Sequence, residues 1–203
     1  MIITEQMNIH EKEWRKNPEK IPRDWDSSKE LLNIIRQTKE GRRIGIIPKI
    51  NMLFDGKFLD DFDVEDMSFN KYYWTHFIKC PGNVRSLKFE RRGLALNICA
   101  ETFLLKEIRF FRPEVIVSMG GLASKWVLEK TEYKNEWTDM LWEELEWVIK
   151  GERQIPEREI PECDHRAKII VLPHPSGINP LATLLNKKFF PKLKVLILRE
   201  LRR

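Results

Sequence analysis

One histidine stands where chemistry is expected, directly after an apolar run of strand length. Residues 168–172 read KIIVL and end at Pro173, and residues 174–179 read HPSGIN. In an open parallel sheet, ligands bind beyond the carboxyl ends of the strands. The spacing therefore predicts that His174 lies at the mouth of a site, with the flanking prolines restricting its loop. The alternative is an ordinary turn after a buried strand.

The composition describes a basic, folded domain. The chain has 203 residues, of which 42% are hydrophobic and 33% charged, and it can bury a full core. Its 36 Lys and Arg against 31 Asp and Glu give a net charge of +5, which favours a polyanionic partner without requiring one. No apolar run approaches the roughly 20 residues of a membrane span, and residues 1–20 carry no secretory signal pattern. We expect no membrane partner.

The three cysteines indicate a reducing environment. Cys80, Cys99 and Cys163 are odd in number and far apart, which argues against a disulfide framework and for a cytoplasmic protein. No two of them have the close spacing that is typical of a zinc site. We therefore expect no metal and no cofactor.

The hydrophobic pattern predicts an α/β fold. Apolar runs predict strands at residues 43–48, 72–78, 114–119 and 168–172, and helical spacing predicts helices at 27–41, 93–111, 122–129, 138–150 and 191–203. Strands that alternate with helices form a parallel sheet covered on both faces. Residues 1–26 are predicted to form an irregular N-terminal arm, and residues 49–70 a long loop. Residues 131–167 are predicted to form a helical insert that contains a Pro-rich link at 155–161. The domain itself spans 27–203.

Several segments, taken in order, resemble the uracil-DNA glycosylase superfamily. Residues 75–81 (THFIKCP), Asn83, Arg85, Cys99 and residues 112–120 (RPEVIVSMG) resemble its iron-sulfur branch. The HPSGIN segment resembles the second active-site motif of the mismatch-specific and single-strand-selective branches. The resemblance covers about residues 43–130 and 168–203. It implies a three-layer α/β/α sandwich around a four-stranded parallel sheet.

The resemblance also implies an activity. Enzymes of this family flip a base out of DNA and hydrolyse its bond to deoxyribose. His174 would donate to the base carbonyl as negative charge develops there, and Ser176 would contact a phosphate. Ile178 would fill the gap that the flipped base leaves. Further DNA contacts are expected at Lys79, Asn83, Arg85, Gly177 and Asn179.

The first family motif departs from its usual pattern. Gly45-Ile46-Ile47-Pro48 resembles the motif in which the family usually places an acidic residue or asparagine to hold the attacking water. Gly45, Ile47 and Pro48 are expected at the base pocket, but isoleucine cannot position water. The replacement candidates are polar residues that could equally be solvated loop residues: Asn51 and Asp55, with Asp60 and Asp61 behind them.

The expected base pocket is altered as well. Phe58 lies where the family stacks an aromatic ring on the base, although Phe54 and Phe62 compete and core packing would explain all three. His76 occupies the position at which many relatives carry the asparagine that reads uracil. Imidazole is larger, and its hydrogen bonding depends on its protonation. We expect a pocket that does not read plain uracil in the usual way, unless His76 is merely structural.

These observations favour one function over two alternatives. Only Cys80 and Cys99 match the four ligands of the iron-sulfur branch, so no cluster is expected. We expect a monomeric, monofunctional DNA glycosylase that acts on a damaged or modified base, such as a modified pyrimidine of phage DNA in host defence. A catalytically inactive DNA-binding module of the same fold is the alternative. A partner-binding protein that uses the Trp-rich insert is a third, weaker possibility.

Overall fold

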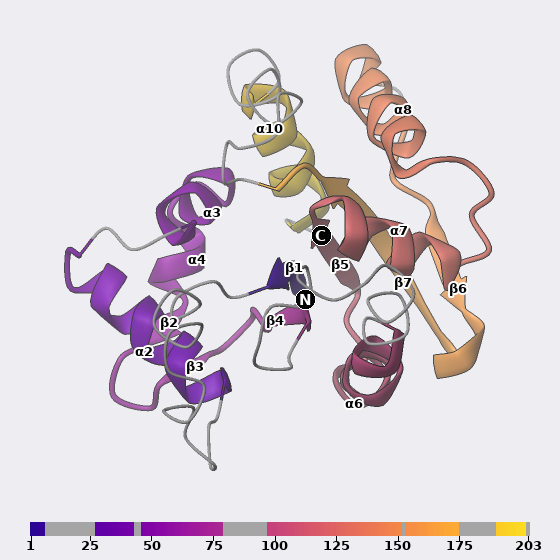
Figure 1. Cartoon of the computed structure of the whole chain (residues 1–203). Coiled ribbons are helices and arrows are strands. Elements are labelled where there is room, and N and C mark those ends of the chain that lie inside the picture. The colour runs from indigo at the N-terminus through magenta and orange to yellow at the C-terminus, as the bar shows by residue number, and fades with distance from the viewer. Residues whose placement is uncertain (7–26, 43–45, 79–96, 152, 175–189, 202–203) are drawn as a thin grey trace, which may run out of the picture.

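A five-stranded sheet forms the centre of the computed structural model, which describes residues 1–6, 27–42, 46–78, 97–151, 153–174 and 190–201 (Figure 1). The strand order is β4-β1-β5-β7-β6. The first four strands pair in parallel, whereas β6 pairs antiparallel to β7. The predicted four-stranded parallel sheet is confirmed, and β6 is added at its edge. The strands are β1 (Ile2–Gln6), β4 (Trp74–Ile78), β5 (Val115–Met119), β6 (Glu157–Ile160) and β7 (His165–Leu172).

Helices cover the sheet on both sides, with α3 and α10 on one side and α6 on the other (Figure 1). Parallel strands require long crossover connections, and α3 and α6 lie within them, whereas α10 follows the last strand. None of the helices in the described ranges combines the length and apolarity needed to cross a bilayer. The helices are α2 (Ser27–Lys39), α3 (Ile47–Leu53), α4 (Lys57–Asp60), η3 (Ala100–Leu104), α6 (Leu105–Phe111), α7 (Gly121–Glu129), α8 (Trp137–Lys150), η4 (Pro161–Cys163) and α10 (Phe190–Leu201).

Most predicted helices are present because their apolar residues repeat at helical spacing. In α10, Leu193, Leu196 and Ile197 are buried at i, i+3 and i+4. The helix predicted over 93–111 is helical from residue 97 to the end of α6, and η3 forms a π-helical turn within it. Helix α2 ends two residues before Gly41, whose φ of 97° is a conformation that favours glycine.

The irregular arm predicted for residues 1–26 is wrong for its first residues. Strand β1 is an interior strand between β4 and β5, and Ile2 and Ile3 are buried. The apolar run is only two residues long before Thr4, so the sequence gives little sign of a central strand. Residues 7–26 lie outside the described residues.

The strand predicted over residues 43–48 is also wrong in its described part. Ile46 is the N-cap of α3, and Pro48 lies in the first turn of that helix. Proline is tolerated there because the first N–H groups of a helix need no intrahelical partner. Ile47, Ile50 and Leu53 are buried along one face of α3. Pro48 therefore marks the start of a helix and not the end of the predicted strand.

Two segments predicted without regular structure contain short elements. Residues 49–70 hold most of α3, then α4, then a hairpin of β2 (Phe62–Asp63) and β3 (Ser68–Phe69). The Pro-rich link at 155–161 contains β6, which pairs with residues 165–168 of β7. The segment 131–167 thus contributes α8 and a strand of the sheet.

Candidate functional site

His174 lies at the carboxyl edge of the sheet. It follows the last residue of β7 by two positions and is half-buried. Because β4, β1, β5 and β7 are parallel, their carboxyl ends meet at this edge. The DNA contacts expected from the sequence lie outside the described residues, and so does Gly45. These contacts are Lys79, Asn83, Arg85, Ser176, Gly177, Ile178 and Asn179.

His76 lies near the same edge on β4, and its side chain is buried. The strand register pairs His76 with Thr4, Thr4 with Met119, and Met119 with Leu172. His76 and Leu172 therefore stand in one row, about 14 Å apart across three strand spacings. His174 comes two residues beyond that row. The fold thus brings both histidines to the carboxyl edge of the sheet, His76 on β4 and His174 after β7.

The hydroxyl of Thr4 is the centre of a buried hydrogen-bond cluster around His76. Thr4 Oγ1 lies 2.7 Å from Nδ1 of His76 and accepts a hydrogen bond from the indole Nε1 of Trp74 at 3.0 Å. It also lies 3.4 Å from the carbonyl oxygen of Thr75. Thr4 has no exposed surface. The cluster holds the imidazole of His76 by its Nδ1 atom.

Phe58 is fully buried in an aromatic core rather than exposed at a cleft. Its ring centroid lies 4.8 Å from that of Phe69 and 5.7 Å from that of Trp74. The Trp74 ring in turn lies 5.8 Å from the imidazole of His76. Phe54 and Phe62 are also buried. Core packing, the alternative to stacking on a base, accounts for the surroundings of these three rings.

The residues expected to hold water have structural contacts. The side-chain oxygen of Asn51 accepts a hydrogen bond from the Leu59 N–H at 2.9 Å and so joins α3 to α4. Asp55 lies in the turn between these helices at a φ of 57°, and its carboxylate pairs with Lys194 of α10 at 2.5 Å. Ile47 is buried and Pro48 is half-buried in the first turn of α3.

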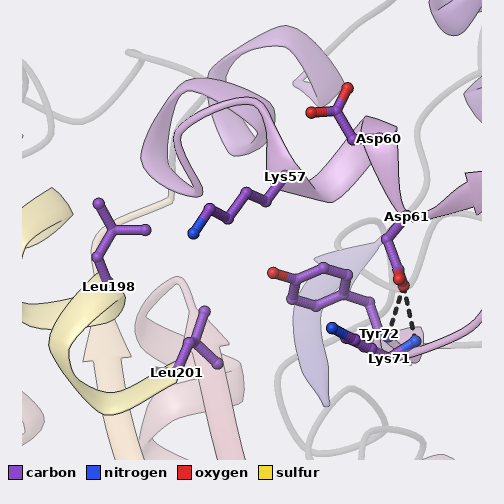
Figure 2. A pocket seen from close by; sticks show the side chains of 7 residues that line it. All are labelled: Lys57, Asp60, Asp61, Lys71, Tyr72, Leu198 and Leu201. Carbon is purple, nitrogen blue, oxygen red and sulfur yellow. Dashed lines mark hydrogen bonds between the residues drawn. The ribbon is translucent and has the colours of Figure 1, made fainter. Parts of the chain in front are cut away.

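Asp61 helps to fix the entry to β4. Its carboxylate accepts hydrogen bonds from the N–H groups of Lys71 at 2.7 Å and Tyr72 at 3.2 Å (Figure 2). Burial, followed by the charge of Asp61, raises the pKa of Tyr72. These residues line a hollow of about 370 Å³ whose other lining residues are Lys57, Asp60, Leu198 and Leu201 (Figure 2).

A second hollow, of about 440 Å³, shares Lys71, Tyr72 and Leu201 with the first. It is also lined by Val115, the first residue of β5. Both hollows thus lie at the amino edge of the sheet, opposite His174. We do not assign either of them to the site that contains the two histidines.

The cysteines do not fit an iron-sulfur cluster. The chain has three in all, and such a cluster normally takes four. Cys99 and Cys163 are buried, and burial raises the pKa of the Cys163 thiol. Cys80 lies outside the described residues. Within the described ranges, no three His, Cys, Asp or Glu residues come together to hold a metal ion.

Sequence reasoning missed Thr4 and Trp74 as partners of His76. The three residues come from β1 and β4, and Thr4 and His76 are 72 positions apart in the chain. No local spacing connects residues at that separation. Only the register of β1 against β4 brings the hydroxyl beside the imidazole.

One comparison with known proteins identifies a family for this chain. The family described as the Uracil DNA glycosylase superfamily matches residues 20–201, which is most of the chain. Neither the curated proteins nor the solved structures contain a significant match. Members of this superfamily are generally DNA glycosylases. On this match, and with a central parallel sheet between helices, the chain belongs to the uracil-DNA glycosylase superfamily.

Proposed function

We propose that this chain is a monofunctional DNA glycosylase that flips a modified base and leaves an abasic site. The observation that carries the proposal is the position of two histidines at the carboxyl edge of four parallel strands. The strand positions of His76 and Leu172 lie about 14 Å apart along this edge, with Thr4 and Met119 between them. The net charge of +5 suits a DNA partner.

The proposed chemistry uses His174 as a hydrogen-bond donor. When the bond between base and sugar breaks, positive charge gathers on the sugar and negative charge on the departing base. A donor already in place at the base carbonyl stabilises that charge without reorganisation. His76 reads the base edge from β4. Asn51 and Asp55 remain candidates for holding the attacking water within this proposal, although their contacts give each of them a structural role.

A panel of DNA duplexes tests the proposal. The protein is incubated with duplexes that carry deaminated, oxidised or otherwise modified bases and with phage DNA containing modified pyrimidines. Abasic sites are then cleaved with alkali. At least one substrate should be cleaved, and His174→Ala should slow that cleavage by about 100-fold to 1,000-fold, the usual cost of removing such a donor.

A histidine at the other end of the same strand provides the matched control. His165 begins β7, and its Nε2 lies 2.9 Å from the carbonyl oxygen of Pro113. His165→Ala should retain cleavage of the same substrate. If no substrate gives cleavage that depends on His174, the enzyme proposal is wrong.

The burial of Ile47 favours a second candidate function. This residue occupies the first family motif, and its side chain is a buried hydrocarbon with no group that could activate water. An inactive module of the same fold would bind DNA in a salt-dependent manner and give no abasic product from any duplex. The same panel, run beside a binding measurement at two salt concentrations, separates the two functions.

A further inference from the structure

The two hollows at the amino edge of the sheet adjoin, because Lys71, Tyr72 and Leu201 line both of them. Their volumes of about 370 and 440 Å³ are each large enough to bind part of a ligand. We call the two hollows together the amino-edge groove. Since His174 lies beyond the opposite ends of the strands, the groove is separate from the site that contains the two histidines.

Aromatic rings form much of the wall of the second hollow. The rings of Tyr73 and Phe111 lie 3.9 Å apart between centroids, and those of Phe69 and Tyr72 lie 6.4 Å apart. Phe110 packs edge-on against Phe111 at 5.0 Å, and 80% of its surface is exposed. Exposed apolar surface that continues into a hollow is typical of an interaction site.

The charges of the amino-edge groove favour a protein ligand over a nucleic acid. The Glu200 carboxylate pairs with Lys168 and Arg199. Among the described residues, the other charged side chains that line the groove are three acids and two bases, namely Asp60, Asp61, Glu114, Lys57 and Lys71. The groove thus lacks the excess of positive charge that binds phosphates, although the chain as a whole carries +5. Glu114 is exposed and lines the same hollow as the rings, so it suits a basic residue of a ligand.

The position of the groove favours one form of protein ligand. A strand adds to a sheet along its side edge, whereas this groove lies at the ends of the strands. An extended segment must therefore be bound through its side chains. Polyproline II segments bind aromatic-lined grooves in this way and keep their carbonyl oxygens free to accept hydrogen bonds. Donors are present in the Tyr72 hydroxyl, which points into the first hollow (Figure 2), and in the Asn70 amide, which lines the second.

We propose that the amino-edge groove binds a proline-rich, arginine-containing segment of a partner protein. The prolines pack on the rings of Tyr73 and Phe111, and an arginine pairs with Glu114 and stacks on a neighbouring ring. Such a partner leaves the carboxyl edge of the sheet open while it is bound. The inference goes beyond the proposed glycosylase function and does not depend on it.

A labelled peptide of sequence PPRPPPRPP tests the proposal by fluorescence anisotropy with the full chain. The wild type should bind this peptide saturably. A peptide with alanine in place of every proline should bind at least about ten-fold more weakly, because it is not preformed as a polyproline II helix. A peptide with glutamate in place of both arginines should also lose affinity, because its charges repel Glu114.

Phe111→Ala should weaken binding of the arginine peptide by about ten-fold, the effect of losing an aromatic anchor. Phe103→Ala is the matched control, because Phe103 is 46% exposed against 45% for Phe111 and lines neither hollow. It should leave the affinity unchanged. Glu114→Gln should lower the affinity and its dependence on salt, whereas Glu146→Gln, on α8, should change neither.

The results that would overturn the proposal are specific. They are the absence of saturable binding, equal affinity for the alanine peptide, or equal losses in Phe111→Ala and Phe103→Ala. Size-exclusion chromatography tests the other occupant of an aromatic surface, which is a second copy of the chain. A dimer that Phe110→Ala converts to a monomer would assign this surface to self-association and would also overturn the proposal.

Discussion

The sheet carries a buried polar cluster on each side of its centre, and the two clusters differ in charge. The threonine cluster consists of Thr4, Trp74 and His76, whose side chains are joined by hydrogen bonds of 2.7 and 3.0 Å. The glutamate cluster consists of Glu144 of α8, Glu200 of α10 and Lys168 of β7. Glu200 has no exposed side-chain surface and pairs with Lys168 at 3.2 Å.

The difference lies in how well each cluster satisfies its groups. The Glu144 side chain is fully buried, and among the described residues its carboxylate oxygens make no well-formed hydrogen bond, although the Val171 N–H lies near. Burial therefore raises the pKa of Glu144, and the Val171 N–H and the charge of Arg158 only partly oppose this. Hydrogen bonds within a buried polar cluster hold its side chains in place, whereas a buried carboxylate costs stability. We expect substitutions in the threonine cluster to change which bases are excised, and substitutions in the glutamate cluster to change the free energy of unfolding.

Breaking the ion pair of the glutamate cluster should have the largest effect on folding. Glu200→Gln leaves Lys168 and Arg199 without their carboxylate partner, and their side chains are only 17% and 26% exposed. The free energy of unfolding in urea should fall by about 2 kcal/mol, because removing one partner strands a mostly buried charge. Glu146→Gln, which breaks an exposed pair with Lys150, is the control and should cost less than about 0.5 kcal/mol. Equal losses in both variants would contradict the comparison.

A substitution in the threonine cluster should change which bases are excised. His76→Asn replaces the imidazole with an amide that offers both a donor and an acceptor. Relative to the wild type, cleavage of plain uracil should rise by about ten-fold, because an additional hydrogen bond to the base becomes possible. His165→Asn, at the amino end of β7, should leave the uracil rate unchanged. A His76→Asn variant that gains nothing on uracil would indicate that His76 is structural.

The smallest expected effect is a pH-dependent change in stability that depends on Glu144. The unfolded chain ionises Glu144 near its ordinary pKa, whereas the folded chain holds this side chain protonated to higher pH. Folding therefore becomes costlier as pH rises above the unfolded value, and the cost is absent below it. Glu144→Gln should stabilise the protein by on the order of 1 kcal/mol at pH 8 and by nothing at pH 4. Thermal unfolding at several pH values measures this difference, and a gain that does not vary with pH would count against a buried acid.

Much of the fold could be predicted because its signals are local. The strands at 74–78, 115–119 and 165–172 follow from apolar, β-branched runs, and α7, α8 and α10 follow from apolar spacing. Pro48 was ambiguous, because proline ends strands and also begins helices. Strand β1 offers two buried isoleucines and then polar residues, so only its pairing with β4 and β5 identifies it.

Some residues of the candidate site could be named from the sequence, and others could not. His174 and His76 could be named because each occupies a motif position beside a strand end. Thr4 could not, because its role depends on the register between strands that are distant in sequence. Phe58 was named from its place in a motif, and its surroundings in the core depend on rings contributed by β3 and β4.

The central position of β1 has a consequence for how the protein folds. Thr4 and His76 meet across 72 residues of chain, and closing so long a loop costs entropy before any contact compensates for it. Helices that depend on local contacts can form earlier, while the edges of β4 and β5 that receive β1 are still open. Such edges pair readily with other chains. A slow step in refolding, with helical signal present and aggregation at high protein concentration, is therefore expected to precede the docking of this strand.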